Sequence, residues 1–350
     1  MRVLVLGGTG AMGLHVCEGL VARGDEVVCT TRRPRPPALG VEYAVGDAHD
    51  QDFLDRVLSR RWDATVDFMI WGTAAFREVS AKLLASTGQY VFISSYRVYA
   101  DSPVIREGSP RLLDVVDDPE YLATDEYALC KARCEDVLFG SEGENWTIVR
   151  PAVTYDGAVG RLQLGVFEAS DWLWRAVCGI PVPMPGEMLE RQATMSAGKD
   201  VAEAIVCLVG NSCAMGEAFT VSGSDHMTWG EVADVYRGVL SSLEIAPCSL
   251  DEFERVRGGI YQIRYDRMFD RVVDNSKVLA ATGMARESFR RMRDGLAPAL
   301  AECLSRPVSL PAFGLQGRFD RLCGGFPAFA PVLRAGGFPA VLKYLARRLL

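Results

Sequence analysis

The sequence has few of the residues that build metal sites. Only three histidines occur in 350 residues, and the ten cysteines are scattered without a Cys-x-x-Cys pair. Structural and catalytic zinc sites draw their ligands from clustered Cys and His residues, so no metal centre is expected. The scattered cysteines favour free thiols in a reducing compartment over disulfides.

Long apolar runs and an excess of positive charge are also missing. No uninterrupted apolar stretch reaches the roughly 20 residues that span a bilayer, and the first residues, MRVLVLGG, have a strand pattern instead of a signal-peptide pattern. The net charge of −7 gives no general footprint for nucleic acid. With 49% hydrophobic and 24% charged residues, the composition predicts a globular protein, and we expect it in the cytoplasm.

The first 33 residues predict a strand, a glycine-rich turn, a helix and a second strand. Glycines spaced three apart separate the apolar run Val3–Leu6 from an amphipathic helix. A turn without side chains lets the backbone approach a pyrophosphate, and the amides at the helix N-terminus bind that anion. We therefore expect a dinucleotide to contact Gly7, Thr9, Gly10, Ala11, Met12 and Gly13.

The end of the second strand bears on the identity of the dinucleotide. NAD is commonly recognised by an acidic residue there, whereas this strand ends at Thr31 and is followed by Arg32 and Arg33. Guanidinium groups suit a 2′-phosphate because they donate two parallel hydrogen bonds to phosphate oxygens. This favours NADP slightly over NAD, and the alternative is a solvated arginine pair before a proline-rich turn.

Strand and helix patterns continue to alternate through residues 41–151, which predicts an α/β fold with a Rossmann-type doubly wound parallel sheet. Ligands of such sheets bind at the carboxyl ends of the strands, where Asp47, Ala48, Gly72 and Ser95 lie. We expect an NAD(P)-binding domain over 1–160. A smaller substrate-binding subdomain, with some strands returning to the sheet, is expected over 161–305, followed by a basic amphipathic extension over 306–350.

Several motifs keep the order found in the extended short-chain dehydrogenases/reductases, a family of nucleotide-sugar epimerases, dehydratases and reductases. The motifs are GGTGAMG (7–13), GD (46–47), FISSYRVY (92–99), YALCK (127–131) and IVRPAVTYDG (148–157). The chain resembles this family over about residues 1–300. The resemblance implies Ser95, Tyr127 and Lys131 as the catalytic residues, with Tyr127, Lys131 and Pro151 also at the cofactor. Departures such as MIWGTAA and MSAGKD mark a divergent member.

The chemistry of these three residues is consistent with that role. A free phenol has a pKa near 10, and an ammonium one helical turn away favours its ionised form. Tyr127 can then act as general acid or base, while Lys131 can also hold ribose hydroxyls and Ser95 orients the substrate oxygen. Ser94 is the alternative to Ser95, which is favoured because it lies four residues before Tyr99.

The two residues after the serine narrow the range of reactions. Tyr96 and Arg97 stand where 4,6-dehydratases of this family carry an Asp-Glu pair, so dehydration is not expected. We expect keto-reduction, or epimerisation through a transient ketone, of a nucleotide-activated sugar in a homodimer, with surface-polysaccharide synthesis as a candidate role. The alternatives are an NADPH-dependent reductase of a non-nucleotide carbonyl and a non-catalytic NAD(P)-binding protein. Candidate substrate contacts are Ser95, Tyr96, Arg191, Arg264 and Arg267.

Two later segments are less specific. The Pro- and Gly-rich stretch 179–192 predicts a loop over the site. Residues 306–350 hold seven Lys or Arg and one Asp, and they end in a short amphipathic helix. Three interpretations of this extension stay open: docking onto the acidic body or a sister subunit, peripheral contact with anionic lipid, and disorder.

Overall fold

The computed structural model describes residues 1–36 and 40–349 of the chain, which fall into two units. Unit 1 comprises Met1–Thr154, Met195–Ser224 and Val273–Arg290. Unit 2 comprises Tyr155–Thr194, Asp225–Val272 and Arg291–Leu350. The expected catalytic and cofactor residues all lie in unit 1.

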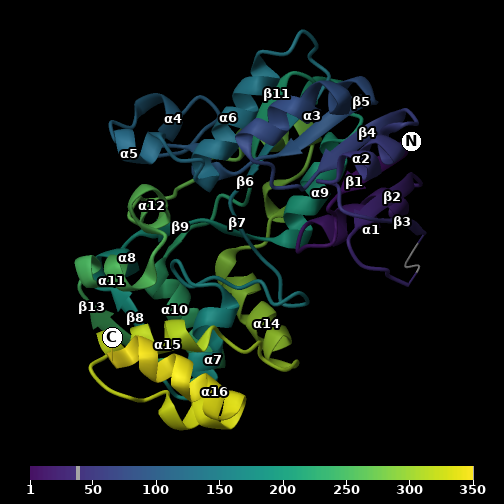
Figure 1. Cartoon of the computed structure of the whole chain (residues 1–350). Helices are drawn as coiled ribbons and strands as arrows, with labels where there is room; N and C mark the ends of the chain where they lie inside the picture. Colours follow the sequence, from purple (N-terminus) through teal and green to yellow (C-terminus); the bar gives the residue numbers. More distant parts are fainter. Residues whose placement is uncertain (37–39, 350) are drawn as a thin grey trace. The chain divides into compact units, whose positions relative to one another are not determined.

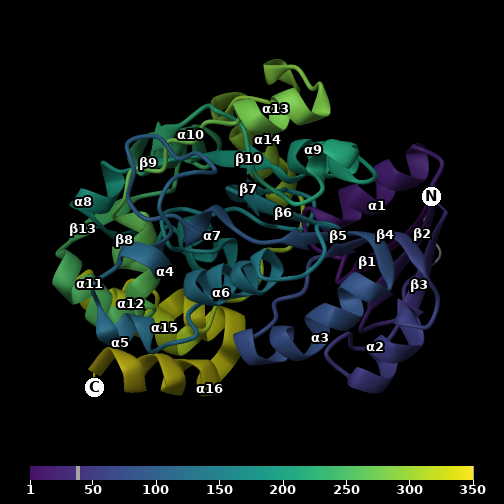
Figure 2. The same cartoon turned by 90° about the horizontal axis from the view of Figure 1, so that it is seen from above.

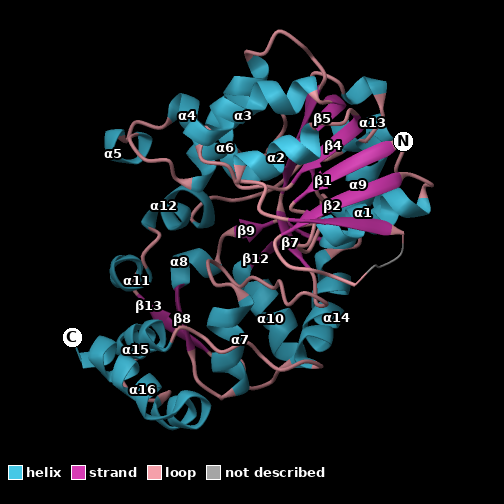
Figure 3. Cartoon of the chain, turned by 45° about the vertical axis from the view of Figure 1, so that its right-hand side comes forward, coloured by secondary structure: helices cyan, strands magenta, loops and turns pink. Residues whose placement is uncertain are grey.

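A seven-stranded sheet with the order β11-β6-β5-β4-β1-β2-β3 forms the centre of unit 1, and every neighbouring pair in it is parallel (Figures 1 and 3). This confirms the predicted Rossmann-type fold. The strands are β1 (Arg2–Leu6), β2 (Glu26–Thr31), β3 (Val41–Val45), β4 (Trp62–Asp67), β5 (Thr87–Ile93), β6 (Trp146–Pro151) and β11 (Glu217–Val221). A short strand, β7 (Val153–Tyr155), pairs with β10 (Met195–Ala197).

Helices cover both faces of the sheet, so its central strands are apolar on both sides. In β1, Val3 and Val5 face one hydrophobic core, and Leu4 and Leu6 face the other. The first core is covered by α1 (Gly13–Ala22), α9 (Gly198–Leu208) and α13 (Ser276–Thr282). The second core is covered by α2 (Gln51–Leu58), α3 (Thr73–Ala85) and α6 (Tyr127–Phe139).

Shorter elements of unit 1 follow the carboxyl end of β5 and fill the other connections. They are η1 (Tyr96–Val98), α4 (Leu112–Val115), α5 (Pro119–Leu122), η2 (Ser212–Ala214) and η4 (Arg286–Ser288). Glu126 caps α6 by accepting a hydrogen bond from the Ala128 amide. The helix that carries the Tyr-x-x-x-Lys pair therefore begins at Tyr127 itself.

Unit 2 is mainly helical, with short two-stranded pairings. Its elements are α7 (Ala169–Val177), β8 (Val182–Pro185), α8 (Gly186–Leu189), β9 (Gln192–Ala193), β12 (Met227–Thr228), α10 (Trp229–Val239), β13 (Ile245–Cys248), α11 (Leu250–Arg257), α12 (Ile260–Gln262), η3 (Ile263–Arg267), α14 (Met292–Leu304), α15 (Phe313–Leu322) and α16 (Phe329–Leu349). The predicted loop over 179–192 is wrong, because it contains α8 and β8, and β8 pairs in parallel with β13.

The extension after residue 305 is helical and belongs to unit 2 (Figure 2). Val332, Val341 and Tyr344 share a hydrophobic core with Trp174 and Ile180. The Arg175 guanidinium is fully buried and contacts Asp320 of α15 at 2.7 Å. This packing holds α15 and α16 against the end of α7. Among the described residues, no helix combines the length and the apolar character needed to cross a membrane.

Candidate functional site

The glycine turn joins β1 to α1 and is tightly closed at both ends. The Gly7 amide donates to Thr30 Oγ1 at 2.9 Å, and Gly7 adopts a φ of 68°. A Cβ on Gly13 would lie 2.6 Å from the Gly8 backbone, whereas one on Gly10 would meet nothing within 4 Å. The turn is therefore closely packed on its inner side and open at Gly10.

A cavity of about 240 Å³ opens at the carboxyl ends of β1 to β4. It is lined by Gly7, Thr9, Thr30, Thr31, Arg32, Gly46, Asp47, Ala48, His49, Phe68, Met69 and Ile70. Gly10, Ala11, Met12 and Gly13 form the turn and the start of α1 beside it. The first amides of any helix lack intrahelical acceptors, so they can donate to a pyrophosphate. These features fit a dinucleotide.

Three predicted cofactor residues, Arg33, Gly72 and Pro151, do not line this cavity. Arg33 is exposed and does not line this cavity, and its carbonyl accepts a hydrogen bond from Thr31 Oγ1 at 2.9 Å. Gly72 lines a second cavity. Pro151 ends β6 and is in register with Val221 of β11.

His49 and Thr30 were not predicted from the sequence. The Asp47 carboxylate accepts the His49 amide at 3.0 Å and lies 3.2 Å from the His49 ring, and these contacts lower the pKa of Asp47. The other ring nitrogen lies 3.2 Å from the Ile70 carbonyl. His49 thus links the loops after β3 and β4, and the only hint in the sequence was its place two residues after Asp47.

The second cavity, also about 240 Å³, contains the Tyr-x-x-x-Lys pair. Its lining is Ile70, Trp71, Gly72, Asp125, Tyr127, Cys130 and Lys131. Ile70 lines both cavities. The predicted base and its ammonium neighbour therefore lie next to the predicted cofactor cavity.

The Lys131 ammonium is buried and fixed by the backbone. It donates to the Ile93 carbonyl at 2.7 Å and to the Met69 carbonyl at 3.2 Å. It also lies 4.5 Å from the centre of the Phe92 ring. These contacts hold the positive charge at the carboxyl ends of β4 and β5, one turn along α6 from Tyr127.

Tyr127 and the two serines differ in their surroundings. Tyr127 is half-buried, with the Arg97 guanidinium 5.2 Å from its ring centre, and Arg97 pairs with Glu126 at 2.6 Å. Ser94 donates its hydroxyl to buried Glu135 at 2.6 Å. Ser95 caps η1 by accepting the Arg97 amide at 3.2 Å, and it does not line the second cavity. Of the two serines, Ser94 therefore uses its hydroxyl in a hydrogen bond inside the protein.

Asp67, at the end of β4, organises the loop that lines both cavities. It is completely buried and accepts hydrogen bonds from the Met69 amide at 2.7 Å, Trp71 Nε1 at 2.8 Å and the Tyr90 hydroxyl at 2.6 Å. Burial raises the pKa of Asp67, although these donors oppose the shift. The sequence alone does not show that Asp67 accepts hydrogen bonds from the loop that follows it.

The predicted substrate residues outside the two cavities are already engaged within their own units. In unit 2, Arg264 pairs with Glu254 at 2.8 Å and Arg191 with Asp270 at 3.7 Å. Arg267 is buried and donates to the Gly165 carbonyl at 2.8 Å. In unit 1, Tyr96 is buried in η1. Their contact with a substrate stays a prediction.

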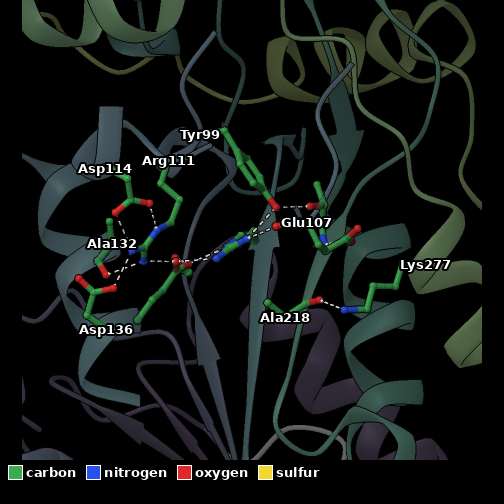
Figure 4. A network of polar contacts seen from close by, with 12 residues as sticks. Tyr99, Glu107, Arg111, Asp114, Ala132, Asp136, Ala218 and Lys277 are labelled. Atoms are coloured by element: carbon green, nitrogen blue, oxygen red, sulfur yellow. Dashed lines mark hydrogen bonds and ion pairs between the residues drawn. The ribbon is translucent and has the colours of Figure 1, made fainter. Parts of the chain in front are cut away.

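A buried network ties α6 to the sheet (Figure 4). Arg150 of β6 donates to both oxygens of Glu135, at 2.8 and 2.7 Å, and to the Tyr99 hydroxyl at 2.9 Å. Arg111 approaches the same carboxylate at 3.5 Å. Burial would lower the pKa of Arg150, but the charge of Glu135 raises it above its ordinary value. Glu135 lies one turn after Lys131, so this pair fixes the helix that carries the site.

Comparison with known proteins gives the class first. Residues 7–171 match a family model described as NAD(P)H-binding. This segment covers the glycine turn, both cavities and the Tyr-x-x-x-Lys helix. Unit 1, which holds residues 7–154 of this match, is therefore similar to NAD(P)H-binding domains.

The chain is also similar to whole proteins. The chain is 28% identical, over 249 residues and 66% of its length, to the chloroplast stem-loop binding protein of 41 kDa b of Arabidopsis thaliana, spanning 61% of that protein. The solved epimerase Mth375 of Methanothermobacter thermautotrophicus has a TM-score of 0.67 at 15% identity, covering 87% of this chain and 92% of that one. MoeE5 in complex with UDP-glucuronic acid and NAD has a TM-score of 0.65 at 18% identity, covering 87% and 99%. These two solved structures share the fold of this chain.

The glycine turn gives the first prediction. Replacing Gly13 by alanine forces a Cβ against the Gly8 backbone, so Gly13→Ala should lower the free energy of unfolding by about 1–3 kcal/mol. Gly10→Ala is the matched control, because its Cβ would point into open space. Urea unfolding followed by circular dichroism measures both. Equal stability of the two variants would contradict the packing described.

The buried pair gives the second prediction. Arg150→Met leaves the Glu135 charge without its partner and should destabilise the protein by about 3–5 kcal/mol. The double variant Arg150→Met/Glu135→Met should recover part of this loss, because no unpaired charge remains. Arg291→Met breaks an exposed pair with Asp294 and should leave stability almost unchanged. A double variant less stable than Arg150→Met would show that the charge is not the cause.

Proposed function

We propose that the protein is an NAD(P)-dependent oxidoreductase or epimerase that acts on a nucleotide-activated sugar. The observation that carries the proposal is the placement of Tyr127 and Lys131 in a cavity that shares Ile70 with the cavity at the glycine turn. A base and a fixed cation beside a dinucleotide site suit hydride chemistry at a carbon that bears oxygen. The nucleotide-sugar complex of MoeE5, a protein of similar fold, supports the substrate class.

We propose the following roles for the residues of the site. A dinucleotide held in the cavity at the glycine turn would supply the acceptor or donor of hydride. Tyr127 Oη removes the hydroxyl proton when the alcohol is oxidised and returns it when the ketone is reduced. The Lys131 ammonium, held by two backbone carbonyls, keeps a positive charge one helical turn from Tyr127 and is proposed to donate to ribose hydroxyls. Ser95, at the end of β5, is proposed to orient the substrate oxygen.

Dehydration is not part of the proposal. The family that the sequence resembles carries an Asp-Glu pair after the serine in its 4,6-dehydratases, and here Tyr96 and Arg97 hold that place. Arg97 pairs with Glu126, the cap of α6. Keto-reduction and epimerisation both remain compatible with the site. They differ in whether the cofactor leaves after each turnover, so mass spectrometry of the cofactor that co-purifies separates them.

A second candidate is supported by the arginines of unit 2. Arg264 and Arg191 pair with carboxylates, and Arg267 lies buried beside Asp266. A diphosphate would have to compete with these acids, whereas a smaller carbonyl compound would not need them. The alternative is therefore an NADPH-dependent reductase of a non-nucleotide carbonyl. A thermal-shift screen of UDP-, GDP-, CDP- and dTDP-sugars would favour this alternative if none of them stabilises the protein.

Assembly is a further part of the proposal. We propose a homodimer, as the family resemblance implies, and sedimentation velocity of the purified chain measures it. A single monomeric species at micromolar concentration would remove this part and leave the proposed reaction untouched.

The third prediction concerns the base. Tyr127→Phe keeps the ring beside Arg97 but removes the ionisable oxygen, so turnover should fall by roughly 10²–10⁴-fold, and cofactor binding should change much less than turnover. Tyr43→Phe, on β3, is the matched control and should retain activity. Stopped-flow absorbance of the nicotinamide and cofactor titration measure the two quantities. Full activity of Tyr127→Phe would end the assignment.

The fourth prediction concerns the choice of cofactor. Arg32 lines the first cavity and Arg33 does not. If Arg32 meets a 2′-phosphate, Arg32→Ala should weaken NADPH binding by roughly tenfold or more, since a charge-assisted hydrogen bond contributes about 1.5–3 kcal/mol. NADH binding should change little, and Arg33→Ala should have the smaller effect on both. Calorimetric titration with each cofactor checks this, and an equal loss for NADH and NADPH would contradict it.

A further inference from the structure

The extension contains a repeat that the proposed reaction does not use. The sequence Gly-Gly-Phe-Pro-Ala occurs at 324–328 and again at 336–340. Both copies bend the chain with a glycine at positive φ, Gly324 at 74° and Gly337 at 64°. The first copy separates α15 from α16, and the second kinks α16. Each turn exposes its phenylalanine, Phe326 by 49% and Phe338 by 68%.

Exposed apolar side chains gather in this part of the chain. Among the described residues, every exposed leucine and three of the four exposed phenylalanines lie beyond residue 305. They are Leu310, Phe326, Phe329, Leu333, Phe338, Leu342 and Leu349. The inner faces of α15 and α16 are already buried against unit 2. These exposed side chains are not used in that core, and we take their concentration in one segment as the sign of an interaction site.

The charge on the same segment has one sign. Asp320 is the single carboxylate side chain among residues 306–350, and it is fully buried. It contacts Arg175 at 2.7 Å and accepts the Tyr344 hydroxyl at 2.5 Å. Arg334 follows exposed Leu333, and Lys343 follows exposed Leu342. The solvent side of α16 therefore combines cations with apolar groups and carries no side-chain carboxylate among its described residues.

We propose that this surface, the exposed side chains of residues 306–349, binds an anionic lipid bilayer peripherally. Phenylalanine and leucine side chains enter the boundary between headgroups and acyl chains, and lysine and arginine contact the anionic headgroups. A nucleic acid would use the cations and leave the exposed leucines and phenylalanines in water. A second copy of the chain would bring cations of like sign together across a two-fold axis. A bilayer satisfies both features at once.

The first test uses the full chain and sedimentation with vesicles. Binding should be stronger to phosphatidylcholine vesicles that also contain phosphatidylserine than to phosphatidylcholine alone. Phe326→Ala/Phe338→Ala should lose roughly tenfold or more in affinity, because two large apolar groups no longer enter the interface. Val104→Ala/Val115→Ala removes two exposed apolar residues of unit 1 and should bind like the parent protein. Circular dichroism melts verify that each variant is folded.

A second set of variants tests the cations. Each cation near an anionic surface contributes about fivefold in affinity, so Arg334→Gln/Lys343→Gln/Arg347→Gln should lose on the order of a hundredfold. Arg61→Gln/Arg77→Gln/Arg293→Gln is the matched control, because it also removes three exposed cations. High salt should abolish the difference between the two triples. Point variants are used because the extension is part of the core of unit 2.

The lipid proposal is overturned by any of three results. The first is that the parent protein pellets equally with both vesicle types or with neither. The second is that the phenylalanine variants change self-association in sedimentation velocity but leave vesicle binding intact. The third is that a single-stranded RNA binds more tightly than the anionic vesicles and that its binding depends on the same cations. None of these measurements uses turnover, so the proposed reaction can fail or succeed independently.

Discussion

The geometry of the site in unit 1 depends on one buried ion pair, Glu135 with Arg150. The pair joins the middle of α6 to β6, and its carboxylate also receives the hydroxyl of Ser94 at the end of β5. An ion pair removed from water holds its geometry only when the remaining polar atoms are satisfied, and Tyr99 and Arg111 supply that here. The helix is thereby fixed one turn beyond Lys131, so the ammonium cannot shift along the sheet without breaking the network.

The sheet could be predicted from local sequence because its signals are local. Val3–Leu6 is apolar on both faces, and the glycines after it predict a tight turn into a helix. The strand β4 ends at Asp67, although Phe68–Trp71 are apolar and would also suit a buried strand. The residues after Asp67 fold back because the buried carboxylate accepts their amide and indole hydrogens. A strand pattern in the sequence carries no information about such a turn.

The site was only partly predictable, because its partners are distant along the chain. Tyr127 and Lys131 are four residues apart on one helix, so their proximity follows from helical spacing. The engagement of Ser94 by Glu135, 41 residues away, could not be read from the sequence. The sequence also did not predict that Asp270 pairs with Arg191 or that Glu254 pairs with Arg264. In 179–192, proline suggested a loop, yet β8 finds its partner β13 about sixty residues later.

Asp320 gives the extension a role inside the protein as well as on its surface. Its carboxylate is the counter-charge of Arg175, whose guanidinium is fully enclosed at the end of α7. An enclosed guanidinium without an acid is strongly unfavourable. A homologue that ends before this segment must therefore carry a neutral residue where this chain has Arg175, or supply an acid from elsewhere. We therefore expect the residues at these two positions to change together among related sequences.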